Sequence, residues 1–346
     1  PAEGGVVILP PGRFEIDSPL RITQSDILIR GAGTATHIHN TNESGEPTLI
    51  IEADPDSGDD TEPQWRVQLS DLRITGNENS GDGIVARDVN EIFIHGVTVS
   101  YHGGDGILLD ECYEDPRVSN SLITYNDGTG LNLIACHDII VSDNQFEENN
   151  DAVRCIDGFN LCMTGNNLDD HLGNGVVIEN TYGSVLAGNM IEECSGFAVI
   201  LDRDCYGISL GSNVIAHNGG GIDLRDAHGC SVSSNTFTIM KSHAVRVGTH
   251  SGRINITGNN ISNSYIGDGE VKRNPDDLAA AGITLESTEN ILLSGNLFSG
   301  LTTPAVEVVN GNSQNVLFNN NLLVDVQTEH TELQNSLMNN NMQTEN

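Results

Sequence analysis

Hydrophobic and polar residues alternate with a period of two over short stretches of the chain, as in Ile222-Asp-Leu-Arg and Val245-Arg-Val. This alternation predicts β-strands with one buried face, whereas stacked pairs of helices need a period of about 3.6 residues. Gly, Asn and Asp, which are typical turn residues, separate the stretches. The pattern therefore predicts an all-β chain of short strands.

A small residue followed by an aliphatic residue recurs along the chain, mostly at steps of 22 to 24 residues. A fixed period of this length predicts a solenoid, here with one repeat per coil and about three strands in each coil. Neighbouring coils then pair as parallel strands about 4.8 Å apart. The pairs are Gly83-Ile84, Gly106-Ile107, Gly130-Leu131, Ala152-Val153, Gly175-Val176, Ala198-Val199, Gly221-Ile222, Ala244-Val245, Gly282-Ile283 and Ala305-Val306.

Asparagine recurs in phase with these pairs, 13 or 14 residues after each aliphatic residue. Stacked amides can hydrogen-bond from one coil to the next, so we predict a buried, structural asparagine ladder at a turn. Its members are Asn120, Asn144, Asn166, Asn189, Asn213, Asn235, Asn259 and Asn296.

The repeat indicates one β-solenoid domain over residues 1–325, followed by a polar cap or tail over 326–346. The step from Ala244 to Gly282 is longer than the others, which predicts a loop inserted at about 265–281. Insertions in solenoids are loops on one face, often the binding face.

The net charge of −34 with only 15 Lys and Arg argues against a nucleic acid or an anionic membrane as partner, because both need a basic surface. The negative net charge also disfavours binding of an anionic polymer, unless basic residues are concentrated in one part of the surface. No apolar run reaches the ~18 to 20 residues of a membrane span, and no signal peptide is visible.

The seven cysteines show no C-x-x-C pair and no zinc-binding spacing. Cys155 and Cys230 fall on inward positions of the repeat. We expect them to be small buried hydrophobic residues.

Charged residues gather on the outward positions of consecutive coils, one and three residues after the aliphatic residue. They include Glu179, Asp202 and Asp223. Glu179 and Asp202 are expected about 4.8 Å apart, and Asp202 and Asp223 about 8 Å, in backbone terms. Carboxylates about 5 Å apart suit a retaining glycosidase and about 6.5–9.5 Å an inverting one, so the stereochemistry stays open.

We take Asp223 as the candidate general acid or base, Asp202 as its partner and Glu179 as the third catalytic carboxylate, since crowded carboxylates can share a proton. Two alternatives are a solvated acidic surface partly neutralised by Arg225, and a Ca²⁺ site built from the same oxygens. No metal is otherwise expected.

Basic residues are scarce, and five of them fall on this strand or on the turn before it. They could bind a uronate carboxylate, and one could abstract the neighbouring proton in β-elimination. Pairing with the acids nearby is the alternative. The candidate substrate-binding residues are Arg225, Arg246, Arg154, Lys241 and His243. Other turn residues, His171 among them, are expected to be solvated turn formers.

The stretch "GGVVILPPGRFEIDSPLRI" with the later "DILIRGAG" resembles the first coils of pectate-lyase-like right-handed parallel β-helix proteins. A helix usually covers that end in such proteins, and its sequence is not seen here, so an open edge is expected at the first coil. The phrases "GCSVSSNTF" and "NILLSGNLF" are similar to those of inulin fructotransferases.

This resemblance implies a carbohydrate-active protein that binds a glycan along the outward face of one sheet. The polygalacturonase motifs and the Asp-Pro-His-Glu motif of alginate epimerases are missing. The expected function is a glycoside hydrolase or transferase, with a polysaccharide lyase or uronate epimerase, or a non-catalytic glycan-binding solenoid, as alternatives. A secreted, periplasmic or cell-surface location is expected, and a homo-oligomer such as a trimer stays open.

Overall fold

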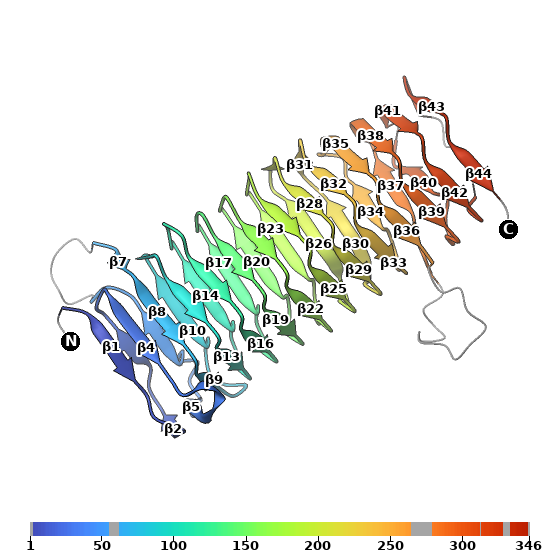
Figure 1. Cartoon of the computed structure of the whole chain (residues 1–346). Coiled ribbons are helices and arrows are strands. Elements are labelled where there is room, and N and C mark those ends of the chain that lie inside the picture. Colours follow the sequence, from blue (N-terminus) through green and yellow to red (C-terminus); the bar gives the residue numbers. More distant parts are fainter. Residues whose placement is uncertain (1–2, 55–61, 264–278, 312, 328–332, 345–346) are drawn as a thin grey trace, which may run out of the picture. The chain divides into compact units, whose positions relative to one another are not determined.

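The computed structural model describes residues 3–54, 62–263, 279–311, 313–327 and 333–344. The chain divides into two compact units, Pro1–Leu172 (unit 1) and Gly173–Asn346 (unit 2). Each is a β-solenoid of about 24 residues per turn, with three parallel sheets, as the period predicted (Figure 1). We call the sheets A, B and C in the order in which each turn of the chain reaches them. That the solenoid forms a single domain over 1–325 stays a prediction.

Unit 1 contributes one strand to each sheet in nearly every turn. Its sheet A holds β1 (Gly5–Ile8), β4 (Ile27–Arg30), β8 (Val67–Ser70), β12 (Phe93–His95), β15 (Arg117–Ser119), β18 (Ile140–Ser142) and β21 (Cys162–Thr164). Its sheet B holds β2 (Gly12–Ile16), β5 (Thr36–Asn40), β9 (Arg73–Thr75), β13 (Thr98–Ser100), β16 (Leu122–Thr124), β19 (Gln145–Glu147) and β22 (Asn167–Asp169). Its sheet C holds β3 (Leu20–Ile22), β6 (Leu49–Ile51), β10 (Ile84–Arg87), β14 (Ile107–Asp110), β17 (Leu131–Ile134) and β20 (Val153–Ile156). A 3₁₀ turn, η1 (Gly33–Ala35), and a strand pair, β7 (Gln64–Trp65) with β11 (Val89–Asn90), complete the unit.

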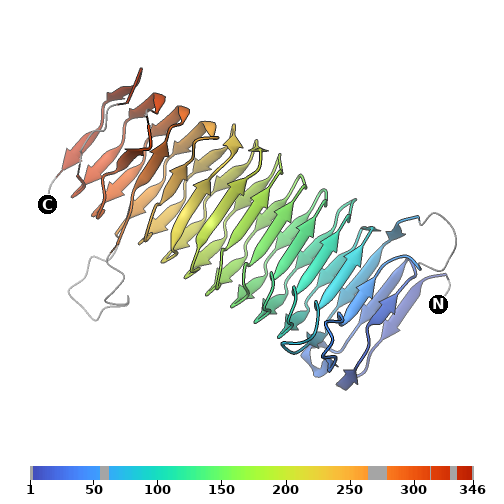
Figure 2. The same ribbon diagram turned by 180° about the vertical axis from the view of Figure 1, so that it is seen from behind.

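Unit 2 repeats this plan (Figure 2). Its sheet A holds β24 (Val185–Ala187), β28 (Ser209–Gly211), β32 (Ser231–Ser233), β35 (Gly252–Thr257), β38 (Glu289–Ser294), β41 (Gln314–Asn319) and β43 (Leu337–Asn339), with β27 (Cys205–Tyr206) and β31 (Ala227–His228) at its side. Its sheet B holds β25 (Met190–Glu192), β29 (Val214–Ala216), β33 (Thr236–Thr238), β36 (Asn260–Ser262), β39 (Leu297–Ser299), β42 (Leu322–Val324) and β44 (Met342–Thr344). Its sheet C holds β23 (Val176–Glu179), β26 (Phe197–Asp202), β30 (Gly220–Leu224), β34 (Val245–Val247), β37 (Ile283–Glu286) and β40 (Val306–Val309).

The segment after residue 325, expected to be a polar cap or tail, includes β43 and β44, which extend sheets A and B. Most of the predicted inserted loop at about 265–281 lies outside the described residues, which resume at residue 279. Ala280 and Ala281, at its end, are buried.

The asparagine ladder is confirmed in both units. In unit 2 the side-chain amide of Asn213 donates to Asn235 Oδ1 at 3.0 Å, and Asn235 donates to Asn259 Oδ1 at 3.1 Å. Each ladder position follows a turn residue of positive φ, such as Ser234 at 59°. This arrangement satisfies buried backbone and amide groups coil after coil.

One predicted member of the ladder, Asn120, is wrong. Asn120 occupies the turn position with φ 50°, and Ser121 takes the ladder position beside Asn144. The pairing of Arg117 with Ile140 shows that this coil has one extra residue before sheet A. Counting the usual number of residues from the aliphatic residue therefore stops one residue before the ladder position in this coil.

A second buried polar column lies inside unit 1, and the sequence analysis missed it. His102 Nδ1 lies 3.1 Å from Asn126 Oδ1, Asn126 donates to Asn149 Oδ1, and the backbone N–H of Asn149 donates to His171 Nδ1. His171, expected to be solvated, is 1% exposed. Burial lowers the pKa of both histidines to about 4.

Six of the seven cysteines are buried, and Cys162 is exposed. Cys155 and Cys230, expected on inward positions, are 0% and 2% exposed. Their predicted place in the core is confirmed.

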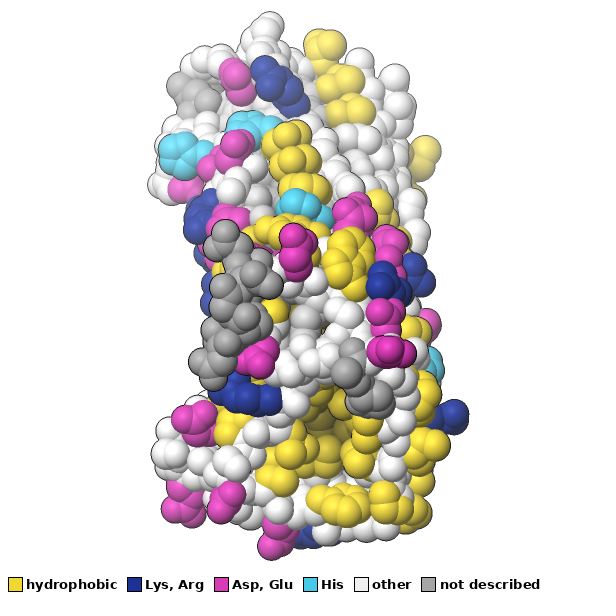
Figure 3. Space-filling model, turned by 90° about the vertical axis from the view of Figure 1, so that its left-hand side faces the viewer, with side chains coloured by type: hydrophobic (Ala, Val, Ile, Leu, Met, Phe, Trp, Pro, Cys, Tyr) yellow, Lys and Arg dark blue, Asp and Glu magenta, His cyan; other side chains and the backbone are white. Residues whose placement is uncertain are grey.

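The first coils of unit 1 enclose an apolar hollow lined by residues such as Leu20, Ile27 and Leu49. Figure 3 shows hydrophobic side chains around this hollow at the end of the unit. Ile8 of β1, the first strand of sheet A, is 74% exposed.

Candidate functional site

Sheet C of unit 2 places the predicted carboxylates in register on adjacent strands. Glu179 on β23 pairs with Asp202 on β26, and Asp223 on β30 pairs with Arg246 on β34. Asp223 pairs backwards with Ile200, two residues before Asp202. The strands form because small and aliphatic residues fill their inward positions, which leaves these side chains on the outer face.

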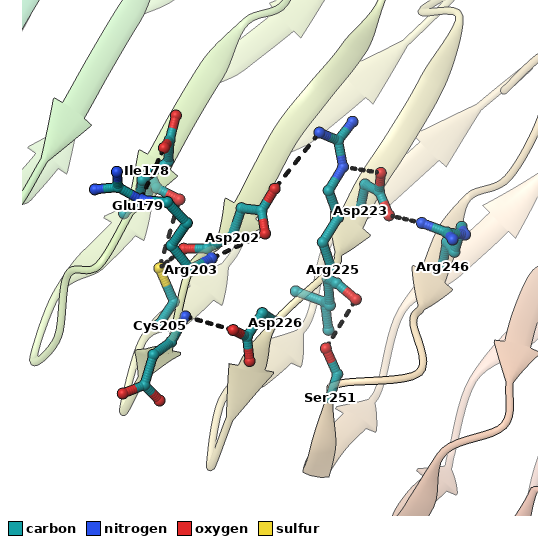
Figure 4. A network of polar contacts seen from close by, with 12 residues as sticks. Ile178, Glu179, Asp202, Arg203, Cys205, Asp223, Arg225, Asp226, Arg246 and Ser251 are labelled. Carbon is teal, nitrogen blue, oxygen red and sulfur yellow. Dashed lines mark hydrogen bonds and ion pairs between the residues drawn. The ribbon is translucent and has the colours of Figure 1, made fainter.

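Asp223 is buried, contrary to the expected outward carboxylate in contact with solvent. Its side chain is 2% exposed because two arginines cover it. Arg225 Nε donates to Asp223 Oδ2 at 2.8 Å, and Arg246 Nη1 donates to Oδ1 at 2.8 Å (Figure 4). Both carboxylate oxygens are therefore occupied by guanidinium groups.

Asp202 and Glu179 are more accessible, with side chains 34% and 18% exposed. Asp202 Oδ2 lies 3.7 Å from Arg225 Nη1, and its Oδ1 accepts the backbone N–H of Arg203 at 2.8 Å. Glu179 pairs with Arg203 Nε at 3.0 Å. Arg225 thus lies between two of the predicted carboxylates, and its guanidinium also lies 5.9 Å from the centre of the Phe197 ring.

Arg246 connects Asp223 to a fourth carboxylate, Glu286 on β37, to which its Nη2 donates. Burial lowers the pKa of Arg246, but its bonds to Asp223 and Glu286 outweigh this effect and raise the pKa. The hydrogen bond from Asn310 at 2.7 Å, followed by that from Arg246, lowers the pKa of Glu286, although burial acts in the opposite direction. Arg246 is thereby fixed in one position.

His243 lies beside Arg246, half-buried, with Nδ1 2.8 Å from the Thr284 hydroxyl oxygen. Burial, followed by the positive charge of Arg246, lowers the pKa of His243, whereas Asp223 and two glutamates act in the opposite direction. The imidazole is therefore neutral near pH 7. Within the described part of the chain, its Nε2 makes no hydrogen bond.

The structure brings five of the eight predicted site residues into one network of ion pairs and hydrogen bonds, which Glu179 joins through Arg203. His243 lies beside this network, next to Arg246. Lys241 is exposed, at the turn between β33 and β34. Arg154 lies half-buried on β20, which belongs to unit 1.

Sequence reasoning missed Arg203, Glu286 and Thr284. Glu286 occupies the same outward position as Arg225, two coils further on, and Thr284 occupies that of Arg246. The position between Arg225 and Glu286 is Gly248, which has no side chain. The repeat therefore predicts that Glu286 and Thr284 lie on this face. Arg203 lies beyond the end of β26, where the repeat does not predict the direction of a side chain.

A separate cluster with metal-binding donors lies where sheets A and C meet in unit 2. One ligand atom each of Asp204, Asp226 and His228 lie within 4.8 Å of one another. Next to it the rings of Tyr182 and Tyr206 stack, with centroids 4.9 Å apart and planes at 9°. Each ring covers one face of the other, and the edges and hydroxyl groups of the pair remain for a ligand.

A family model described as a right-handed β-helix region matches residues 24–160, 57–215, 118–261 and 198–346. The chain belongs to the right-handed β-helix family. No curated protein matches the chain by sequence. Among the described residues, no helix is long and apolar enough to cross a membrane.

Solved structures with a similar fold include both enzymes and an adhesin. The A-module of the mannuronan C-5 epimerase AlgE6 of Azotobacter vinelandii is 18% identical, with a TM-score of 0.66 over 99% of this chain and 91% of that one. The DFA-IIIase of Arthrobacter chlorophenolicus A6 is 13% identical, with a TM-score of 0.61 over 91% and 83%. PfbA, a surface adhesin of Streptococcus pneumoniae, is 11% identical, with a TM-score of 0.58 over 92% and 82%. At these identities the likeness shows the fold alone.

Proposed function

We propose that this β-helix protein is a carbohydrate-active enzyme that binds a uronate-containing polysaccharide on the outer face of sheet C in unit 2. In this proposal His243 removes the C5 proton of a bound uronate, and Arg225 binds its carboxylate. The observation that carries the proposal is a neutral, half-buried histidine beside Arg246, which shares the buried Asp223 with Arg225. A polysaccharide ligand also agrees with a location outside the cytoplasm.

His243 has the properties of a general base. Its lowered pKa keeps the ring neutral near pH 7, and the contact of Nδ1 with Thr284 fixes the ring. A positioned base accelerates proton transfer by about 10²- to 10⁴-fold.

Arg225 supplies the positive charge that this reaction needs. Asp223 holds its Nε, while the side chain stays 41% exposed. Its other N–H groups can bind a carboxylate in a bidentate manner and stabilise the negative charge that develops when the C5 proton leaves. Either the C4–O bond then breaks and the leaving oxygen takes a proton, as in a lyase, or a proton returns to the opposite face of C5, as in an epimerase.

The four carboxylates of the network all have an arginine within ion-pairing distance. A glycosidase needs one carboxyl group that can donate a proton to the substrate, whereas both oxygens of Asp223 accept hydrogen bonds from arginines. For this reason we assign Asp223 the role of positioning the arginines, in place of the general acid that the sequence suggested.

Glycoside hydrolysis or transfer is the second candidate function, because Glu179 and Asp202 are in register on adjacent strands. Their spacing of about 4.8 Å suits a retaining mechanism. In that mechanism Asp202 is the nucleophile and Glu179 the acid and base.

The test is to incubate the wild-type protein with a panel of polyuronates and neutral polysaccharides. Absorbance of unsaturated uronates detects a lyase, deuterium exchange at C5 detects an epimerase, and new reducing ends without absorbance detect a hydrolase. We expect one of the first two signals, with an acid limb of kcat/KM below pH 6.5, the usual pKa of histidine.

His243→Gln should lower the rate by about 10²-fold or more, whereas His250→Gln, at an exposed turn residue, should leave it unchanged. Reducing ends alone, lost with Asp202→Asn, would establish the second candidate. Binding without any of the three signals would overturn both and leave a non-catalytic glycan-binding solenoid.

A further inference from the structure

Three basic side chains lie in one column on the outer face of sheet B in unit 1. Arg13 on β2 pairs in register with His37 on β5, and His37 pairs with Arg73 on β9. Adjacent strands are about 4.8 Å apart, so the two arginines lie one strand to either side of the histidine. The next outward column on the same strands holds Glu15, His39 and Thr75.

The two histidine rings are fixed by a shared hydroxyl. Thr75 Oγ1 lies 2.7 Å from His37 Nε2 and 2.8 Å from His39 Nδ1. Because a hydroxyl has a single proton, at least one of the rings must donate an N–H to it. For the other two ring nitrogens, His37 Nδ1 and His39 Nε2, no hydrogen bond is recorded among the described residues, so they can contact a ligand.

This column is a local concentration of positive charge in a chain of net charge −34. Arg73 makes no ion pair among the described residues, and Arg13 pairs only with Glu15, at 3.2 Å, with both side chains more than half exposed. Such an exposed pair is weak and exchanges readily with a ligand. On the far side of Arg73 the column continues with the uncharged Thr98 of β13.

The positive charge of the arginines affects the pKa of both histidines. Burial, then Arg73 and Arg13, lower the pKa of His37. Burial, then Arg13, lower the pKa of His39, while Glu15 acts in the opposite direction. An anion bound between the arginines would offset their effect, so binding and protonation of His37 should favour each other.

We propose that Arg13, His37 and Arg73 form a binding site for an oxyanion group, a carboxylate or a sulfate, of an acidic saccharide. The column spans only three strands, which suits one or two anionic groups and not the long basic surface that a nucleic acid requires. Guanidinium groups bind carboxylate and sulfate oxygens through charge-assisted hydrogen bonds.

A structural explanation accounts for only part of this column. β2 is the first strand of sheet B, and a charged residue such as Arg13 on an edge strand discourages pairing with another chain. Arg73 lies two strands inside the sheet, where no edge needs protection. The unpaired Arg73 beside a half-buried histidine is the feature that points to a ligand.

The experiment follows the ring signals of His37 and His39 by NMR while the full chain is titrated with trigalacturonate, maltotriose or inorganic sulfate. We expect trigalacturonate to shift both signals, to raise the pKa of His37, and to bind more weakly as salt is added. Maltotriose should have no effect, and inorganic sulfate should bind more weakly than the trisaccharide.

Arg73→Gln should weaken binding of trigalacturonate by about tenfold or more. The matched control is Arg117→Gln on sheet A, an exposed arginine that also makes no ion pair among the described residues, and it should bind as the wild type does. Equal binding of the two variants, or no shift with trigalacturonate, would overturn the site. Sulfate that binds as tightly as the trisaccharide would overturn the saccharide assignment.

The proposal does not depend on the reaction proposed for sheet C. His243→Gln removes that reaction and should leave the NMR titration of His37 unchanged. Failure of either proposal can therefore be recognised separately.

Discussion

Replacing Asp223 by Asn tests whether the buried carboxylate organises the two arginines. Asn has the same shape but only one acceptor oxygen, so its amide group would face the N–H groups of either Arg225 or Arg246. Asp223 is 2% exposed and accepts one hydrogen bond of 2.8 Å from each arginine, which leaves no room for water to replace the lost acceptor.

The size of the effect follows from these contacts. Removing one partner from a buried ion pair costs about 3–5 kcal/mol, and a hydrogen bond to a charged group contributes about 1.5–3 kcal/mol. Arg246 keeps Glu286, and Arg225 is 41% exposed and can be rehydrated. We therefore expect the lower end, a loss of about 3 kcal/mol in the free energy of unfolding.

The assay is urea unfolding followed by circular dichroism at pH 7, comparing midpoints at constant slope. Asp204→Asn, at an exposed aspartate of the same unit, is the control and should change the free energy of unfolding by less than about 0.5 kcal/mol. Combining Asp223→Asn with Arg246→Met should destabilise by less than the sum of the single changes. If Asp223→Asn loses less than about 1 kcal/mol, the carboxylate does not hold the arginines.

Three further predictions concern the solenoid itself. Acid should destabilise unit 1, because around pH 5 to 6.5 only the unfolded chain protonates His102 and His171. We expect a loss of about 1.5 kcal/mol per histidine between pH 6.5 and 5, checked by urea midpoints at both values. A variant with both residues changed to Asn should lose this dependence. Asn144→Ala removes two donated and one accepted hydrogen bond from the buried ladder and should lower the free energy of unfolding by about 2–4 kcal/mol; a thermal midpoint equal to the wild type would contradict the ladder's structural role. Gly221→Ala would place a methyl group 2.1 Å from a carbonyl oxygen of the next coil and should lower the free energy of unfolding by about 2 kcal/mol or more. Gly211→Ala, whose nearest contact is 3.4 Å, should be tolerated, so the melting curves of the two variants should separate.

The period-two alternation and the repeating small and aliphatic pair were enough to predict the parallel solenoid and most of the asparagine ladder. Every coil packs against its neighbours in the same way, so the same pattern of residues recurs in each coil. The prediction failed at Asn120, where one extra residue in the coil moved the ladder position to Ser121. Strand pairing, and not the count of residues, fixes the register.

The sequence by itself determined which charged residues share the outer face of sheet C, because alternation along a strand dictates the side on which each residue lies. Only the tertiary structure decided which of them reach solvent. Asp223 follows the outward pattern and is nevertheless buried, because Arg225, two residues later, and Arg246, one coil further on, both turn back over it. Long side chains bend towards the nearest opposite charge, and periodicity along the chain carries no information about that choice.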